Sequence, residues 1–181
     1  MRNLFRISRV TLASGFVGLA LGLGYIFALI PNVEGITFTV FTSGVILGSS
    51  WGITVGVVSY FLFSLFNPYG LAPLPVLIAQ LLGGAIIGAC GGYLRKAIIR
   101  LSGNPKSIFY LGLASGVILT LIYDILTNIG AYFSIGTPSG SIWVFILGGI
   151  VFSVVHIVSN GLLFTALSFL WTRLVRIVDI R

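Results

Sequence analysis

Charged side chains are scarce in this sequence. Asp, Glu, Lys and Arg make up 7% of the 181 residues, whereas a soluble domain is about a quarter charged. Hydrophobic residues make up 57%. So few charges cannot cover a surface that faces water, which excludes a soluble enzyme and a disordered tail. The one cysteine, Cys90, also excludes an intrachain disulfide framework. The composition indicates an all-α integral membrane protein.

The side chains that most catalytic and metal sites need are also few. Three acidic residues and one histidine are too few for a two-metal carboxylate site or a zinc site, so we expect no metal and no cofactor. The sequence has no GxxxxGK[ST] phosphate-binding loop, and the chain is therefore not expected to hydrolyse ATP itself. A Ser-His-Asp triad of Ser153 or Ser159 with His156 and Asp124 is formally available, but nothing orients it. We expect a protein that is not an enzyme.

Long apolar stretches predict membrane-spanning helices, because about 20 apolar residues cross a bilayer. The second stretch is ambiguous, since as one helix it would rise about 46 Å, well beyond the roughly 30 Å hydrocarbon core. Divided near residues 48–52, it becomes two short helices. The five apolar stretches are 10–30, 36–66, 75–94, 107–133 and 142–172.

The basic residues decide between these two interpretations. They form three clusters, and loops rich in Lys and Arg stay on the cytoplasmic side. Division of the second stretch places all three clusters inside, whereas a single span would place the middle one outside. We therefore predict one transmembrane domain over residues 1–181, a six-helix bundle with both termini cytoplasmic, in a prokaryotic plasma membrane. The clusters are Arg2, Arg6 and Arg9; Arg95, Lys96, Arg100 and Lys106; and Arg173, Arg176 and Arg181. The predicted helices cover about 8–30, 36–49, 52–66, 75–95, 107–133 and 142–173.

Polar residues inside or beside these helices are candidate ligand contacts. An acidic side chain at mid-bilayer costs about 2.5–3.5 kcal/mol and normally faces a cavity or a partner. At 1.5 Å per residue, Asp124 and Asn128 share a face in the outer third of their helix, and His156 is expected deeper. The group as a whole predicts a pocket that opens to the exterior. The candidates are Asn32, Glu34, Asn67, Gln80, Asp124, Asn128, Tyr132, Trp143 and His156.

Each candidate also has a structural alternative. Asp124 could form a helix-helix hydrogen bond with His156 or Gln80, and His156 could be a satisfied core histidine. Glu34 could be a solvated loop acid. The two asparagines beside prolines could only cap helix ends.

Small residues form a second pattern. Ser14, Gly18 and Gly22 recur every four residues on the first helix, and in lipid such a stripe lets another helix approach closely. Packing inside the same bundle is the alternative for this stripe. The denser glycine run over 83–92 is expected to pack internally.

The order of several segments along nearly the whole chain carries a family resemblance. These segments are Pro31-Asn32-Val33-Glu34, the paired short helices through Gly44-Val45-Ile46-Leu47-Gly48 and Trp51-Gly52, Asn67-Pro68, and Tyr123-Asp124-Ile125-Leu126-Thr127-Asn128. The chain resembles the substrate-binding S components of energy-coupling factor (ECF) transporters.

The resemblance implies a membrane-embedded protein that captures a vitamin or related micronutrient from outside. It would work with a T component and two cytoplasmic ATPase subunits, which drive uptake by toppling the S component in the membrane. In this family a small-residue pattern on the first helix docks the T component, and its counterpart here is Ser14, Gly18 and Gly22.

We hypothesise that Glu34, Asp124 and Asn128 hydrogen-bond the ligand while Tyr132 or Trp143 stacks on it. Two acids near the site favour a neutral or cationic ligand over an anionic one. A stand-alone secondary transporter or small channel is the main alternative, and it should show a polar path across both membrane halves. A structural or assembly protein would lack an enclosed outer cavity.

Overall fold

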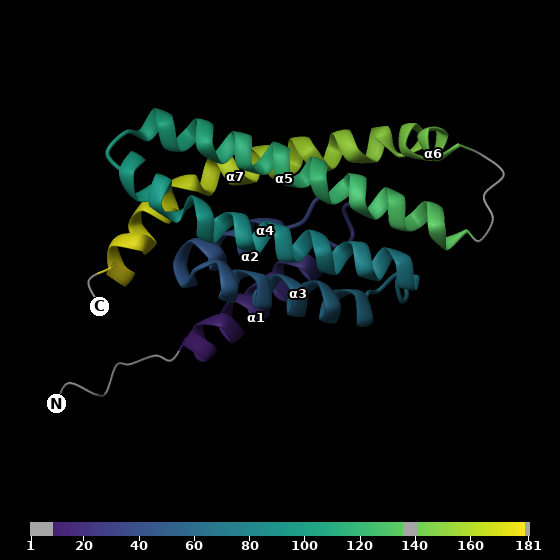
Figure 1. Cartoon of the computed structure of the whole chain (residues 1–181), viewed down its shortest axis with the longest axis horizontal. Helices are drawn as coiled ribbons and strands as arrows, with labels where there is room; N and C mark the ends of the chain where they lie inside the picture. Colours follow the sequence, from purple (N-terminus) through teal and green to yellow (C-terminus); the bar gives the residue numbers. More distant parts are fainter. Residues whose placement is uncertain (1–8, 136–140, 180–181) are drawn as a thin grey trace.

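The computed structural model describes residues 9–135 and 141–179, and these residues form helices and short links without any strand. The helices run roughly along one direction, and α6 lies at the opposite end of the bundle from the start of α1 and the end of α7 (Figure 1). Arg2, Arg6, Arg181 and the centre of the predicted loop 134–141 lie outside the described residues. The helices are α1 Arg9–Phe27, α2 Ile36–Leu47, α3 Ser49–Leu65, α4 Leu74–Leu101, α5 Pro105–Ser134, α6 Ile142–Gly148 and α7 Ile150–Asp179.

Four of these helices, α1, α4, α5 and α7, are long and apolar enough to span a membrane. The shorter helices α2 and α3 are also apolar. The all-helical character predicted from composition is therefore confirmed for the described residues, and the long apolar helices are compatible with a membrane protein. Both α4 and α7 extend beyond their predicted ends, and each carries an arginine in its last turn, Arg100 and Arg176, which suits the negative end of the helix dipole.

The predicted helix 142–173 is broken, so the described chain has seven helices instead of six. The break falls at Gly149, between α6 and α7. A Cβ at this position would lie 2.9 Å from Oδ1 of Asn128 on α5. The glycine therefore lets the α6–α7 junction approach α5 closely.

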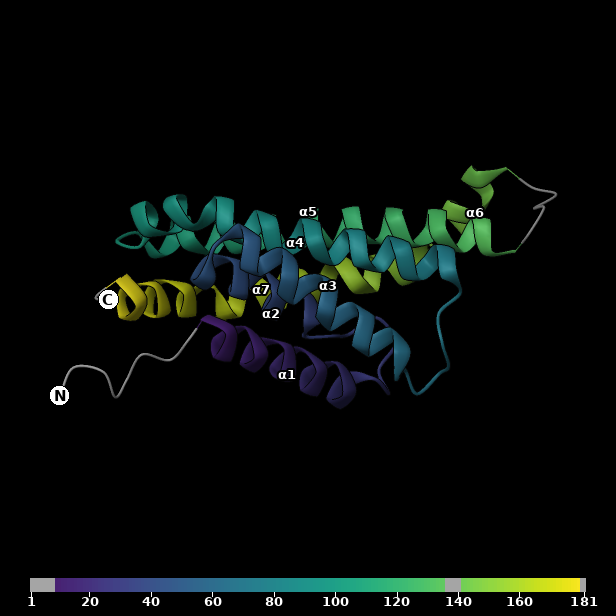
Figure 2. The same ribbon diagram turned by 60° about the horizontal axis from the view of Figure 1, so that its bottom comes forward.

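The ambiguous stretch 36–66 is two helices that meet at Gly48, as the charge placement predicts. Gly48 has φ +93°, a conformation that residues with a Cβ rarely adopt. Every residue of α2 is buried, because this short helix packs against α1, α3, α4 and α7 (Figure 2). At its carboxyl end, Arg95 of α4 donates to the carbonyls of Val45 and Ile46, at 2.9 and 2.6 Å, and so satisfies carbonyls that a helix end leaves free.

Glycines bring α2, α3 and α4 into backbone contact. A Cβ on Gly88 of α4 would clash with the carbonyl of Gly52 on α3, and one on Gly44 of α2 would clash with the carbonyl of Gly88. The internal packing predicted for the glycine run 83–92 is confirmed. Close backbone approach of this kind is the usual way for helices to associate without a hydrophobic driving force.

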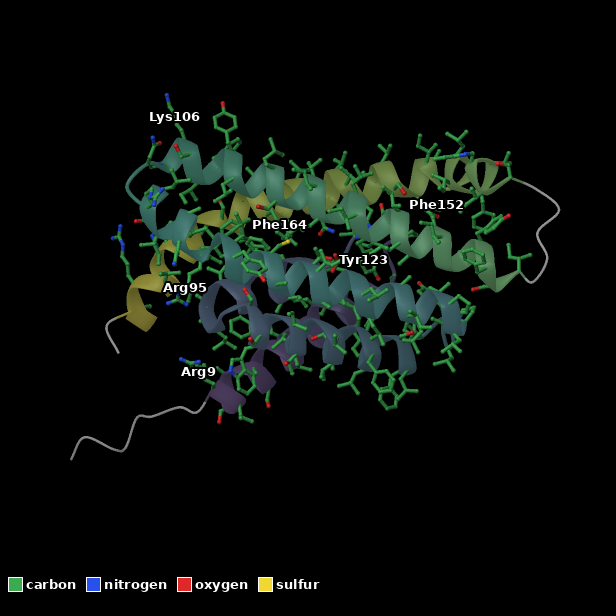
Figure 3. The ribbon with its side chains drawn as sticks, in the orientation of Figure 1. Arg9, Arg95, Lys106, Tyr123, Phe152 and Phe164 are labelled. Carbon is green, nitrogen blue, oxygen red and sulfur yellow. The ribbon has the colours of Figure 1, made fainter. Side chains whose placement is uncertain are left out.

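Basic residues from separate parts of the chain gather at one end of the bundle. Arg9 at the start of α1, Arg95 on α4 and Lys106 on α5 lie at the end where α1 begins and α7 finishes (Figure 3). The opposite end holds α6 and the link between α3 and α4 (Figure 1). The fold is therefore electrostatically asymmetric along its long axis.

Candidate ligand-binding site

The link between α1 and α2 carries Glu34 into the bundle. Asn32 in this link adopts φ +57°, which asparagine tolerates better than most residues. The Ser159 hydroxyl of α7 donates to the Asn32 carbonyl at 2.8 Å and holds the link against that helix. Glu34 Oε2 accepts the backbone N–H of Thr37 at 2.9 Å, which places a carboxylate at the positive end of α2. Only 19% of the Glu34 side chain is exposed, so it is not a solvated loop acid.

Three titratable side chains lie in a row at the centre of the site. His156 Nδ1 is 2.7 Å from Asp124 Oδ1, and His156 Nε2 is 3.5 Å from Glu34 Oε1. Asn160, one turn further along α7, donates from Nδ2 to the same Glu34 oxygen at 3.0 Å. Ionised carboxylates only accept hydrogen bonds, so an imidazolium with an N–H on each side satisfies both contacts. We call Glu34, Asp124 and His156 the carboxylate–histidine cluster.

The Glu34 carboxylate is held in its ionised form. Burial raises its pKa, but the hydrogen bond and positive charge of His156, with the bonds from Thr37 and Asn160, bring the pKa below its usual value. The cluster holds two carboxyl groups and one imidazole, so its acidic groups outnumber its basic one.

A ring of hydroxyls and aromatic side chains surrounds the cluster. Thr37 Oγ1 and the Tyr60 hydroxyl are 2.8 Å apart. The Tyr60 ring lies 5.0 Å from the ring of Tyr123, which stands edge-on to His156 at 6.0 Å. The Tyr123 hydroxyl interacts with Gln80 of α4. The site therefore draws side chains from α2, α3, α4, α5 and α7, and its geometry depends on the whole bundle.

Several buried acceptors near the cluster receive no hydrogen bond from the described residues. They are Asp124 Oδ2, Asn160 Oδ1 and Gln80 Oε1. Three hydroxyls, those of Ser59, Ser64 and Thr120, also lack a partner there. The three carboxylate and amide oxygens differ from these, because they can only accept. Each is a buried acceptor without a donor among the described residues.

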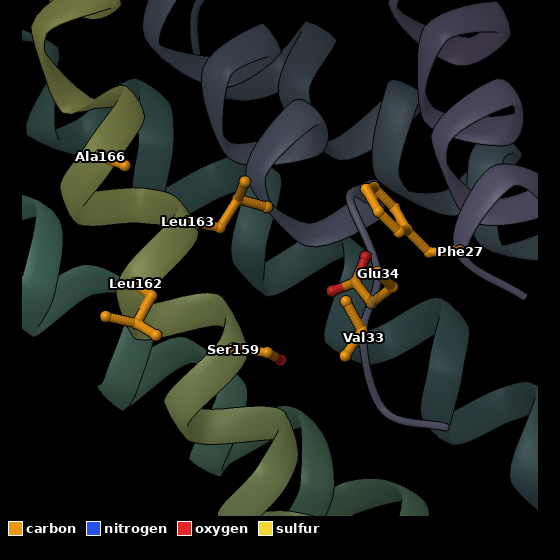
Figure 4. A pocket seen from close by; sticks show the side chains of 7 residues that line it. All are labelled: Phe27, Val33, Glu34, Ser159, Leu162, Leu163 and Ala166. Atoms are coloured by element: carbon orange, nitrogen blue, oxygen red, sulfur yellow. The ribbon is translucent and has the colours of Figure 1, made fainter. Parts of the chain in front are cut away.

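An open pocket of about 320 Å³ reaches Glu34 from between α1 and α7. Figure 4 shows Phe27, Val33 and Glu34 on one side, facing the α7 side chains on the other. The volume is at the lower end of the range for small-molecule sites. Apart from Glu34 and Ser159 the lining is apolar. It comprises Phe27, Val33, Glu34, Ser159, Leu162, Leu163 and Ala166.

Large aromatic side chains fill the bundle between the cluster and the basic end. Phe41, Phe164 and Trp171 are fully buried, and they pack with Phe38 at ring distances of 5.0–6.0 Å. The Trp171 indole donates to Thr42 Oγ1 at 2.9 Å, so its one polar atom is satisfied. Phe164 lies on the basic side of Tyr123 (Figure 3). We call Phe38, Phe41, Phe164 and Trp171 the aromatic plug.

The structure brings Glu34, Asp124 and His156 together. The hydrogen bond between Asp124 and His156 corresponds to the structural alternative for Asp124, although one of its oxygens stays unpaired. His156 lies at the level of Asp124 and not deeper, since the two side chains are in direct contact. Asn128 shares the Asp124 face but contacts the α6–α7 junction.

Other predicted contacts lie elsewhere. Asn67 Oδ1 accepts the backbone N–H of Tyr69 at 2.8 Å and shapes the α3–α4 link. Tyr132 packs against Phe145 of α6 with ring centroids 6.1 Å apart, and the Trp143 side chain is largely exposed. Of the nine predicted ligand contacts only Glu34 lines the pocket. Ligand contact by the remaining residues stays a prediction.

Sequence reasoning missed several members of the site. Asn160 is not among the sequence-predicted contacts, although it lies on the same helix face as His156, one turn later. Tyr60 sits in an apolar run that carries no helical pattern of polar residues. The pocket-lining side chains Leu162 and Leu163 look like any lipid-facing leucine, and nothing in the sequence distinguishes them.

No family model, no curated protein and no solved structure matches this chain. Within residues 9–135 and 141–179, no group of three His, Cys, Asp or Glu side chains is placed to hold a metal ion. The geometry of the site suits a small molecule that binds the Glu34 carboxylate and occupies the apolar pocket beside it.

Proposed function

We propose that the chain is the substrate-binding S component of an ECF-type importer in a prokaryotic plasma membrane. It captures a vitamin or related micronutrient from outside and passes it inward with a T component and two cytoplasmic ATPase subunits. One observation carries the proposal. The carboxylate–histidine cluster lies on one side of the aromatic plug, and the basic end lies on the other. A capture subunit needs this arrangement, a site that is accessible from one face and closed toward the other.

The proposal includes a topology of six spans with both termini cytoplasmic. In it α2 and α3 cross the membrane as two short spans joined at Gly48, and α6 with α7 forms the last span. The support is the position of Arg9, Arg95 and Lys106 at one end, since positively charged residues stay on the cytoplasmic side. The other end would face the exterior.

The surface of α1 supports docking of a T component. Ser14, Gly18 and Gly22 are all exposed, and a Cβ added to either glycine would have nothing within 4 Å. The stripe therefore does not pack inside this bundle, which removes the alternative interpretation. A small-residue face open to lipid suits close approach of a partner helix.

Co-expression with a T component and two ATPase subunits tests the assignment. We expect the four proteins to co-purify and to take up substrate into vesicles only when ATP is hydrolysed. Gly18→Trp should abolish co-purification, because it fills the small-residue stripe. Leu19→Trp is the matched control, since Leu19 is the neighbouring residue and is 52% exposed. Equal co-purification of both variants would contradict docking through this stripe.

One observation favours a second candidate, a stand-alone secondary transporter. The row of Asp124, His156 and Glu34 has the chemistry of a proton relay. Vesicles that contain the purified chain alone distinguish the two functions. Uptake driven by a pH gradient without ATPase subunits would support the transporter and refute the S component.

A further inference from the structure

The carboxylate–histidine cluster has more negative charge than its surroundings balance. Glu34 and Asp124 share a single imidazole between them. Arg95 of α4 contacts the carboxyl end of α2, about 17 Å from the Glu34 end of that helix by helical rise. Arg9 and Lys106 also lie at the basic end (Figure 3). One imidazole cannot balance two carboxylates, and an excess of buried negative charge is costly. The site therefore favours a positive group.

The unpaired atoms around Glu34 indicate the same ligand chemistry. Asp124 and Asn160 are more than nine-tenths buried, and each keeps one oxygen that accepts no hydrogen bond from the described residues. The amide nitrogen of Asn160 donates a hydrogen bond to Glu34, and the His156 imidazole lies between Glu34 and Asp124. Neither residue lines the pocket, so a ligand there reaches the Glu34 carboxylate itself, and the unpaired oxygens add to the negative potential around it.

The pocket limits the rest of the ligand. Of its seven lining residues only Glu34 is charged, and the walls on α7 are formed by Leu162, Leu163 and Ala166. A hydrated inorganic ion would gain nothing from these walls. An apolar or aromatic body of small-molecule size would bury its surface against them.

We propose that the ligand of this site is an organic cation, whose protonated amine or amidinium group binds Glu34 while its apolar body occupies the pocket between α1 and α7. This inference deepens the proposed function, because it names the chemical class of the substrate. The positive group neutralises the excess negative charge of the cluster. The apolar body of the ligand fits a pocket that is almost free of polar side chains.

Three small probes of similar size test the inference. They are 2-phenylethylammonium, 2-phenylethanol and 3-phenylpropionate, which share a phenyl ring and differ in charge. The purified full-length chain in detergent is titrated with each probe, and the thermal unfolding midpoint is followed, since a ligand that binds the folded state raises it. We expect a saturable rise with the ammonium probe, with an affinity roughly tenfold or more above that of the alcohol, because charge-assisted hydrogen bonds are about twice as strong as neutral ones. The carboxylate probe should give no rise.

Two variants show where the ammonium probe binds. Glu34→Gln removes the charge and should abolish the preference for the ammonium probe over the alcohol. Ala166→Trp fills the pocket without touching the cluster, so it should also abolish the preference for the ammonium probe. It replaces Glu34→Gln as the test if that variant does not fold. Val158→Trp is its matched control, since Val158 lies on the same helix, is 54% exposed and does not line the pocket. This control should bind like the unmodified chain.

Each other result overturns the inference. Equal or tighter binding of the alcohol or the carboxylate probe would show that the site does not select cations. An ammonium preference that survives in Glu34→Gln or Ala166→Trp would place the binding elsewhere, and no binding of any probe would also refute the proposal. Failure of co-purification or ATP-driven uptake, with ammonium binding intact, would instead refute the S-component function and leave the ligand class standing.

Discussion

Replacement of His156 by alanine should destabilise the protein strongly, because the imidazole separates two carboxylates. Its Nδ1 is 2.7 Å from Asp124, and its Nε2 is 3.5 Å from Glu34. Loss of one partner from a buried ion pair usually costs about 3–5 kcal/mol of unfolding free energy. We expect a loss near the lower end of this range, about 3 kcal/mol, because Glu34 is 19% exposed and keeps its bonds to Thr37 and Asn160.

The assay is equilibrium unfolding of the purified protein in mixed micelles, followed by tryptophan fluorescence. His156→Phe is a size control, since it keeps most of the side-chain volume but removes the charge. It should lose nearly as much stability as His156→Ala. Adding Asp124→Asn to His156→Ala removes one of the two unbalanced carboxylates and should restore about half of the loss, as expected for coupled neighbours.

Two results would refute this reasoning. A loss below about 1 kcal/mol for His156→Ala would show that the imidazole does not balance the carboxylates. A stable His156→Phe protein would show that the loss comes from a cavity and not from charge.

Three further predictions concern packing. Gly88→Ala should lower stability by about 1–3 kcal/mol or more, because its methyl group would clash with the backbone of α3. Gly18→Ala is the control in the same unfolding assay, and it should be neutral because its methyl group meets open space. Arg95→Ala should cost about 1.5–3 kcal/mol, since it frees two carbonyls at the end of α2 from a charged donor; unchanged stability would show that water or neighbouring groups replace it. Trp171→Phe should cost about 1 kcal/mol for the lost indole hydrogen bond and should leave ligand affinity unchanged; reduced affinity would place the aromatic plug within the binding site.

The sequence predicts the division of residues 36–66 because the positions of charges limit how often the chain can cross the membrane. The glycine run 83–92 is also predictable, since small residues in lipid serve close packing. The break at Gly149 is not predictable in the same way. Asn128 of another helix approaches closely at this glycine, and a Gly-Gly pair in an apolar run has no local signature for that contact.

For the site, the sequence identifies the residue types but not their partners. Asp124 and His156 stand out because titratable side chains are costly in lipid. The approach of Glu34 to them is a long-range contact, set by how deeply the α1–α2 link turns into the bundle. Asn160 is not predictable for the same reason, since its bond to Glu34 spans more than one hundred residues of sequence.

The most direct test of the account is chemical access to two serines, one in the pocket and one on α2 toward the basic end. In a Cys90→Ala background, Ser159→Cys places a thiol in the pocket, and Ser43→Cys places one on fully buried α2, on the way to the basic end. Both changes are nearly isosteric. In intact cells and in inverted vesicles, a membrane-impermeant thiol reagent should label the Ser159→Cys variant from the exterior only and should not label the Ser43→Cys variant from either side. Labelling of the Ser159→Cys variant from the cytoplasmic side, or of the Ser43→Cys variant from any side, would contradict a site that opens outward and is closed beneath.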